Sequence, residues 1–336
     1  MFLREQLPRL RDQWGQPYHL WMTQEFQDFG WQLVQKTLSQ DRSHDVTLFI
    51  QDPQGRFALM SKHSYPPGVF RSPSGGVKPG ETCEAGALRE AKEETGLDVT
   101  LQRFLLHITL DITHRDEVTR WESYIFDASG EGPDLPFTDH KEVKDARWAT
   151  QDEMEEMDRR MIASGNGGLE YRGRLADAYL WALAHPLSIR PAAKKDLQRI
   201  SESPAGDDER IGSIDGVKWW VAEVGGQYAG ALALKARPEC LELVGLNVES
   251  HFRGRGIGHA LTEYVADQSR KESFLEAAGP DVANATSGGL WLLTKTPGYF
   301  MPTGFSFKAQ EELPASFKAG LKPSPHYIPT AMKYEG

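Results

Sequence analysis

Three glutamates, Glu90, Glu93 and Glu94, are spaced three and four residues apart in a stretch of good helix formers. On an α-helix this spacing places all three carboxylates on one face. Like charges so close together repel one another, which disfavours the pattern in a purely structural helix. A divalent cation removes that repulsion, and carboxylate oxygens suit Mg²⁺ or Mn²⁺. The spacing therefore predicts a metal site on a helix.

The flanking residues define the element that carries these glutamates. Thr82 is a good N-cap and Gly96 a good helix stop, so a helix is expected over residues 82–95. A glycine- and proline-rich loop over residues 66–80 precedes it and lets the backbone approach a ligand closely. Ala87 and Ala91 supply an apolar side for docking on a sheet.

This stretch resembles the Nudix box, G-x5-E-x7-R-E-U-x-E-E-x-G-U. The matching residues are Gly75, Glu81, Arg89, Glu90, Ala91, Glu93, Glu94, Gly96 and Leu97. Ala91 stands where a bulkier aliphatic residue is often found. The resemblance implies an α/β/α sandwich with a mixed sheet that hydrolyses a nucleoside diphosphate linked to another moiety.

The resemblance also implies roles for single residues. Metal ligands would be Glu90, Glu93, Glu94 and the carbonyl of Ser74, with Glu93 and Glu94 also counted as catalytic. Arg89 would orient the glutamates through charge-assisted hydrogen bonds. Water would attack phosphorus while the metal neutralises developing charge.

Nudix enzymes often use a further catalytic glutamate from outside the box. Glu142 is the candidate here, with Glu117 and Glu122 as alternatives. For each of the three, an ordinary surface position is the competing interpretation.

A second glycine loop follows an apolar strand at residues 241–248 and opens a helix at about residue 256. Consecutive glycines let backbone N–H groups point into one concavity, which favours a phosphate. Arg253 and Arg255 add positive charge. A dinucleotide fingerprint fails at its last position, because His259 stands where glycine is required. A plain tight turn leaves the arginines unexplained.

The loop resembles the pyrophosphate loop of GNAT acetyltransferases, R/Q-x-x-G-x-G/A, matched by Arg253, Gly256 and Gly258. The strand and helix at 188–201 and the stretch 290–305 resemble the family's opening and closing elements. The resemblance implies a mixed-sheet α/β fold and acetyl-CoA as cosubstrate. Residues implied to contact acetyl-CoA are Val248, Arg253, Gly254, Arg255, Gly256, Ile257, Gly258 and His259.

Acetyl transfer needs a base for the acceptor amine and often a tyrosine for the departing thiolate. Glu242 lies eleven residues before Arg253, where some GNAT enzymes place the base; a solvent-facing strand carboxylate is the alternative. The usual tyrosine position holds Phe300, so Tyr299 is the candidate acid. The stretch 293–297 is similar to N-acetylglutamate synthase-type domains, which implies a small amine or amino acid as acceptor.

Strands are expected at residues 46–50, 56–60, 101–110 and 121–127, and helices at 151–162 and 170–184. The boundary between the two halves is placed near Pro186. The expected organisation is an N-terminal extension (1–43) packing on a Nudix domain (44–186), followed by a GNAT domain (187–336).

The net charge of −10 is concentrated in the first half of the chain. That balance argues against a nucleic-acid polymer as partner, since a phosphate backbone requires clustered cations. The sequence has no apolar run long enough for a membrane span. Cys83 and Cys240 are expected to be free thiols in a cytoplasmic protein. The oligomeric state is left open.

The sequence therefore predicts a bifunctional enzyme. It would combine metal-dependent hydrolysis of a nucleotide with acetylation of a small amine. In one alternative the GNAT-like half only binds acyl-CoA as a sensor. In another the chain is a scaffold without turnover, which the complete Nudix box disfavours.

Overall fold

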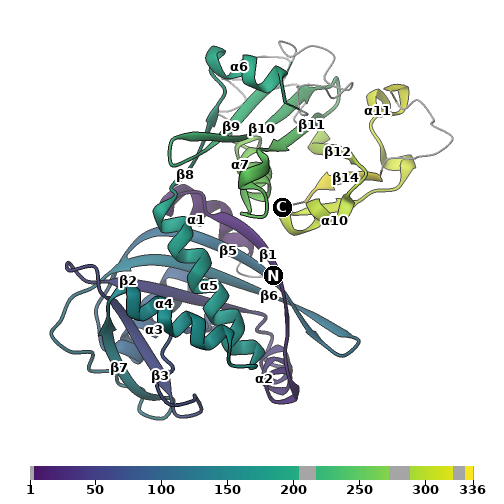
Figure 1. Ribbon diagram of the computed structural model, residues 1–336. Coiled ribbons are helices and arrows are strands. Elements are labelled where there is room, and N and C mark those ends of the chain that lie inside the picture. Colours follow the sequence, from purple (N-terminus) through teal and green to yellow (C-terminus); the bar gives the residue numbers. More distant parts are fainter. Residues whose placement is uncertain (1–3, 204–216, 272–287, 321–329, 336) are drawn as a thin grey trace. The chain divides into compact units, whose positions relative to one another are not determined.

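The computed structural model describes residues 4–203, 217–271, 288–320 and 330–335. The chain divides into two compact units, Met1–His185 and Pro186–Gly336 (Figure 1). Each unit is built on a mixed seven-stranded sheet. None of the described helices is both long and apolar enough to cross a membrane.

The first unit has sheet order β1-β5-β6-β2-β3-β7, with β4 paired to β2. Its helices are α1 (Leu7–Trp14), α2 (Asp28–Leu38), α3 (Cys83–Thr95), α4 (Gln151–Ile162) and α5 (Gly167–Ala184). Its strands are β1 (Tyr18–Glu25), β2 (His44–Gln51), β3 (Phe57–Lys62), β4 (Ser74–Gly75), β5 (Thr100–His114), β6 (Glu117–Ser129) and β7 (Val143–Ala149).

Two helices cover opposite faces of this sheet. Leu48 of β2 lies in the apolar cluster that includes Ala87 and Ala91 of α3. Its neighbour Phe49 stacks on Tyr179 of α5, with ring centroids 3.7 Å apart. Successive strand residues point to opposite faces, so α3 and α5 sandwich the sheet. This is the expected α/β/α architecture (Figure 1).

Helix α3 begins and ends where its flanking residues predict. The Thr82 hydroxyl accepts a hydrogen bond from the Ala85 amide at 3.1 Å, and Gly96 adopts a left-handed φ of 77°. A Cβ on Gly96 would also lie 2.2 Å from the carbonyl oxygen of Pro136. Both the conformation and the space therefore require glycine there.

Residues 4–38, which precede the Nudix box, contain α1, β1 and α2, which the sequence did not predict. β1 joins the sheet parallel to β5, with Tyr18 opposite Leu106. Leu7 and Leu10 of α1 lie in the apolar cluster of α3. Arg9 forms an ion pair with Glu84 at 2.7 Å. β1 is thus part of the sheet, and α1 is part of the core beneath α3.

Several other elements differ modestly from expectation. α5 begins at Gly167 rather than at residue 170, because the Asn166 side chain caps the Leu169 amide at 3.1 Å. β5 and β6 are longer than expected and form one hairpin that turns at Arg115, whose φ is 53°. The expected hairpin of β2 and β3 is present, with Gln51 opposite Phe57.

The second unit has sheet order β13-β14-β12-β11-β10-β9-β8. Its strands are β8 (Leu187–Pro191), β9 (Lys218–Val224), β10 (Gln227–Ala236), β11 (Leu241–Val248), β12 (Leu290–Thr294), β13 (Phe305–Phe307) and β14 (Thr330–Tyr334). Its helices are α6 (Lys194–Ser201), α7 (Ile257–Gln268), α10 (Pro297–Phe300) and α11 (Ala315–Gly320). β11 pairs with β12 in parallel over Leu241–Leu243 and continues beyond that stretch to Val248.

A buried carboxyl group lies on α4 in the first unit. Asp158 is 1% exposed, and its Oδ2 has no hydrogen-bond partner among the described residues. Burial, aided by the charge of Asp177, raises the pKa of Asp158 to about 8. The protonated form is therefore the stable one in the folded unit.

Asp158→Asn should remove a pH-dependent loss of stability. Because the folded-state pKa is raised, the contribution of Asp158 to stability is fully present below its unfolded pKa of about 4 and is lost as pH rises through about 8. The variant should exceed wild-type stability by roughly 1–3 kcal/mol at pH 9 and approach it at pH 5. Urea unfolding at both pH values measures this, with the exposed Asp152→Asn as control. Parallel pH curves for wild type and Asp158→Asn would contradict the expectation.

Candidate active sites

Glu90 and Glu93 of α3 share one arginine with Glu81. The Arg89 guanidinium donates to Glu90 at 2.7 Å, to Glu93 at 3.0 Å and to Glu81 at 2.9 Å. It also donates to the Gly76 carbonyl at 2.6 Å, which ties the glycine loop to the helix. The arrangement matches the orienting role expected of Arg89.

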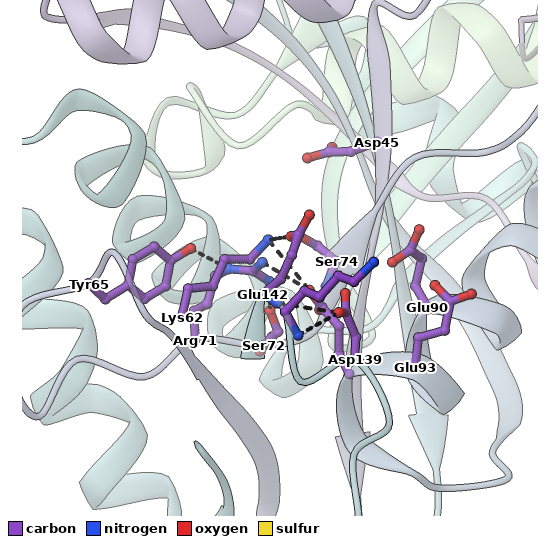
Figure 2. Close-up of polar contacts among 12 residues, drawn as sticks. Asp45, Lys62, Tyr65, Arg71, Ser72, Ser74, Glu90, Glu93, Asp139 and Glu142 are labelled. Atoms are coloured by element: carbon purple, nitrogen blue, oxygen red, sulfur yellow. Dashed lines mark hydrogen bonds and ion pairs between the residues drawn. The ribbon is translucent and has the colours of Figure 1, made fainter. Parts of the chain in front are cut away.

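Glu94 is buried on the other side of this group. Its carboxylate accepts a hydrogen bond from the Ser74 amide at 2.7 Å and lies 3.4 Å from the Arg71 guanidinium. Lys62 approaches Glu94 at 3.7 Å and also forms an ion pair with Glu142 (Figure 2). The sequence predicts that the Ser74 carbonyl is a metal ligand. The hydrogen bond from its amide to Glu94 holds Ser74 beside the box.

Glycine is required where the loop passes the helix. A Cβ on Gly75 would lie 2.0 Å from the Glu90 carboxyl carbon. Any side chain there would displace Glu90, so the close approach of β4 to α3 depends on glycine. Burial raises the pKa of Glu90, the Arg89 hydrogen bond opposes this, and the charges of Glu94 and Glu93 add to the rise.

These residues fit a divalent cation. Arg89 supplies one positive charge to three carboxylates, those of Glu81, Glu90 and Glu93. Carboxylate oxygens are hard ligands of the kind that Mg²⁺ prefers. Glu90, Glu93 and Glu94 would hold the ion.

The three candidate glutamates from outside the box lie in different surroundings. The Glu93 carbonyl accepts hydrogen bonds at 3.0 Å from the amides of Thr138 and Asp139, which brings the loop of Glu142 to α3. Glu142 itself is exposed. Glu122 is buried, accepts from His107 at 2.7 Å and pairs with Arg4 at 2.5 Å, while Glu117 begins β6 and is exposed.

In the second unit the glycine loop precedes α7. Gly254 and Gly256 have φ of 74° and 78°, and Gly256 is the N-cap of the helix. Arg253 turns back and donates from Nε to the Val248 carbonyl at 2.9 Å. The structure therefore places Val248 and the whole stretch Arg253–His259 together at the start of α7.

Tyr299 faces this loop. A Cβ on Gly258 would lie 1.9 Å from the Tyr299 hydroxyl, and the tyrosine ring lies 4.4 Å from the His259 ring. Phe300 is buried instead. Although 36% of Tyr299 is exposed, desolvation of its hydroxyl at the loop raises the pKa of Tyr299, so the hydroxyl stays protonated and can donate. The side chain at 299, not 300, is the one turned to the loop.

Glu242 is not a solvent-facing strand carboxylate. It is 1% exposed, and its Oε2 accepts from Arg237 Nε at 2.7 Å and Nη2 at 2.5 Å. The alternative interpretation of this residue is wrong, because its side chain points into the unit rather than outward.

The family models match the two units separately. A model of the NUDIX domain matches residues 41–165, and a model of the acetyltransferase (GNAT) family matches residues 188–291. The chain is a NUDIX domain followed by a GNAT-family domain. The two matched segments are thus of a hydrolase type and an acetyltransferase type, respectively. No curated protein matches it significantly.

Solved structures resemble parts of this NUDIX–GNAT chain. N-acetylglutamate synthase from Neisseria gonorrhoeae, complexed with coenzyme A and L-arginine, is 21% identical over 45% of this chain and 34% of that one (TM-score 0.33). A C. elegans Ap4A hydrolase binary complex is 24% identical over 41% and 97% (TM-score 0.29). A NUDIX hydrolase from Nitrosomonas europaea is 20% identical over 35% and 78% (TM-score 0.28). The chain spans about a third of the synthase's length.

Sequence reasoning missed three residues of the NUDIX site. Lys62 ends β3, Arg71 forms a bridge with Met60, and Tyr65 accepts a hydrogen bond from Arg71 at 2.8 Å. All three precede the box in the sequence. They lie close to Glu94 or its partners only because of the way β3 folds. No local pattern marks them.

Arg89→Met should destabilise the NUDIX domain. The change leaves Glu81, Glu90 and Glu93 without their shared cation, at a cost of roughly 1–3 kcal/mol in EDTA. Added Mg²⁺ should recover part of that loss by supplying the missing charge. Thermal unfolding with and without Mg²⁺ measures both effects, with Arg160→Met on α4 as control. Equal stability of Arg89→Met and wild type in EDTA would contradict the charge-balance argument.

Proposed function

We propose that the NUDIX domain hydrolyses a nucleoside diphosphate linked to another moiety, with Mg²⁺ or Mn²⁺. The observation that carries this proposal is the grouping of Glu90 and Glu93 around Arg89, with Glu94 bound to the Ser74 amide. A bound Mg²⁺ would neutralise charge on the phosphates. The substrate and products are small nucleotides, in keeping with the acidic charge balance.

The protein groups then have distinct tasks. Arg89 holds Glu90 and Glu93 in orientation, and Gly75 leaves room for Glu90 against the backbone. Glu142 accepts the proton of the attacking water; its exposed carboxylate is held near Glu94 by the shared partner Lys62. Hydrolysis breaks a P–O bond of the diphosphate and forms one to the water oxygen.

We further propose that the GNAT domain transfers an acetyl group from acetyl-CoA to a small amine or amino acid. The loop Arg253–His259 would bind the cosubstrate's pyrophosphate through backbone N–H groups at the start of α7. Tyr299 would protonate the departing thiolate. Glu242 would accept the amine's proton, which requires Arg237 to yield to the incoming substrate.

The sensor alternative is less favoured by the geometry. The sensor alternative depended on Phe300, which stands at the position where GNAT enzymes usually have a tyrosine. Tyr299 supplies a protonated hydroxyl at the loop from the neighbouring position. Catalysis and acyl-CoA binding are therefore both supported.

Glu94→Gln should abolish most phosphohydrolase activity. The change removes a charged oxygen from the proposed metal site, and turnover should fall by about two orders of magnitude or more. A screen of nucleotide sugars, dinucleotides and nucleoside triphosphates with Mg²⁺, read by released phosphate products, measures this. Glu93→Gln, at a more exposed position, serves as a second variant, and Glu84→Gln on the same helix is the control.

Circular dichroism would establish that both site variants remain folded. Full activity of the two folded variants, or of the wild type in EDTA, would refute metal-dependent hydrolysis.

Gly256→Val should weaken acetyl-CoA binding by the full-length chain. Valine is strained at φ of 78° and would keep the pyrophosphate away from the backbone amides. We expect at least about a tenfold rise in Kd by calorimetry. Gly226→Val, at the same φ of 78° in the β9–β10 turn, controls for backbone strain. Absence of acetyl-CoA binding by the folded wild type would overturn this proposal.

A further inference from the structure

A cavity of about 530 Å³ opens in the first unit beside the proposed metal site. Lys62 lines this cavity and also contacts Glu94 and Glu142. Tyr65 and Asp45, both labelled in Figure 2, line it as well. The cavity and the glutamates of the box are therefore neighbours that share one cationic side chain.

One wall of the cavity comes from α2. Phe29, Leu33 and Thr37 are four residues apart, so they share one helical face, and all three line the cavity. Phe29 is 66% exposed and Leu33 is 51% exposed. Large apolar side chains exposed around a hollow mark a ligand surface. α2 lies outside the stretch matched by the NUDIX family model.

The opposite side of α2 is fixed to the domain. Trp31 is buried and stacks on His114, with ring centroids 5.3 Å apart. Asp28 forms an ion pair with His114 at 3.2 Å. Gln27, at the N-cap, accepts a hydrogen bond from the Gly167 amide at 2.8 Å. The helix is thus held against β5 and α5, while Phe29 and Leu33 stay available to a ligand.

The cavity also contains an ordered polar group. Arg172 pairs with Asp45 at 2.5 Å and donates to Thr47 at 3.0 Å. Ser123 donates to Asp45 at 2.5 Å and accepts from Tyr171 at 2.7 Å. Ligand sites combine mostly apolar walls with a few fixed polar groups, in volumes of about 300–1,000 Å³. This cavity meets that description.

We propose that the cavity receives the nucleoside of the substrate and that Phe29 and Leu33 determine specificity for it. The inference rests on the proposed hydrolase function. A nucleobase has flat apolar faces, which suit Phe29, and a polar edge, which suits Asp45 and Arg172. The phosphates then extend past Lys62 toward Glu90, Glu93 and Glu94. A purely apolar group, such as an isoprenoid, would leave the Asp45–Arg172 pair facing hydrocarbon.

The kinetic test uses the double variant Phe29→Ala/Leu33→Ala in the full chain. Both side chains are largely exposed, so the fold should persist. Probes are ADP-ribose, UDP-glucose and diadenosine tetraphosphate. For those that the wild type hydrolyses, KM should rise about tenfold or more while kcat stays within about twofold, because uniform binding is lost. Val118→Ala, 64% exposed in the same domain and outside the cavity lining, should match the wild type.

The binding test requires no hydrolysis. Calorimetry measures the four nucleoside 5′-monophosphates and, as the apolar comparison, an isoprenoid monophosphate. We expect the wild type and Val118→Ala to bind a nucleotide about tenfold more tightly than the double variant does. Equal nucleotide binding by the double variant and the wild type, no nucleotide binding by the wild type, or its preference for the isoprenoid, would overturn the assignment. Nucleotide binding that depends on α2, without hydrolysis of any diphosphate, would refute the proposed hydrolase function but leave the cavity assignment standing.

Discussion

The concentration of carboxylates on α3 is the constraint around which the NUDIX domain is arranged. Three glutamates within five residues repel one another, and the fold meets this with Arg89, the Ser74 amide, Arg71 and Lys62. Each partner comes from a different segment. The helix must therefore dock close to the sheet, which its alanines and Gly75 permit. Burial, and to a smaller extent the charges of Glu94 and Glu93, keep the pKa of Glu90 raised against the opposing effect of Arg89.

In the GNAT domain, the loop before α7 is suited to binding a negatively charged group, in contrast to the carboxylate-rich helix α3. Glycines with positive φ, Gly254 and Gly256, form the turn that opens α7, and Gly256 is the N-cap of the helix. Arg253 closes the loop onto the end of β11, and Tyr299 packs on Gly258. A protonated hydroxyl and a set of amide donors thus lie at one helix start, an environment suited to negative charge.

The N-terminal segment links fold and specificity in the NUDIX domain. α1 packs under α3 and β1 extends the sheet, so residues before the box stabilise the element that carries the glutamates. α2 is anchored by Trp31 and Asp28 and presents Phe29 and Leu33 to the cavity. Through α2, this segment lines the cavity beside the box, where we propose that the nucleoside of the substrate binds.

The sequence by itself determined the features that depend on near neighbours. Four of these features follow from spacings within one helical turn. They are the shared face of Glu90, Glu93 and Glu94, the cap at Thr82, the stop at Gly96 and the loop before α7. Only the tertiary structure decided the rest. It buried Glu242 with Arg237, turned Tyr299 toward Gly258, made β1 a strand of the sheet, and brought Lys62, Arg71 and the Asp45–Arg172 pair to the site. Most of these contacts join residues far apart in sequence, and their side-chain directions are set by strand pairing and helix docking that no local pattern encodes.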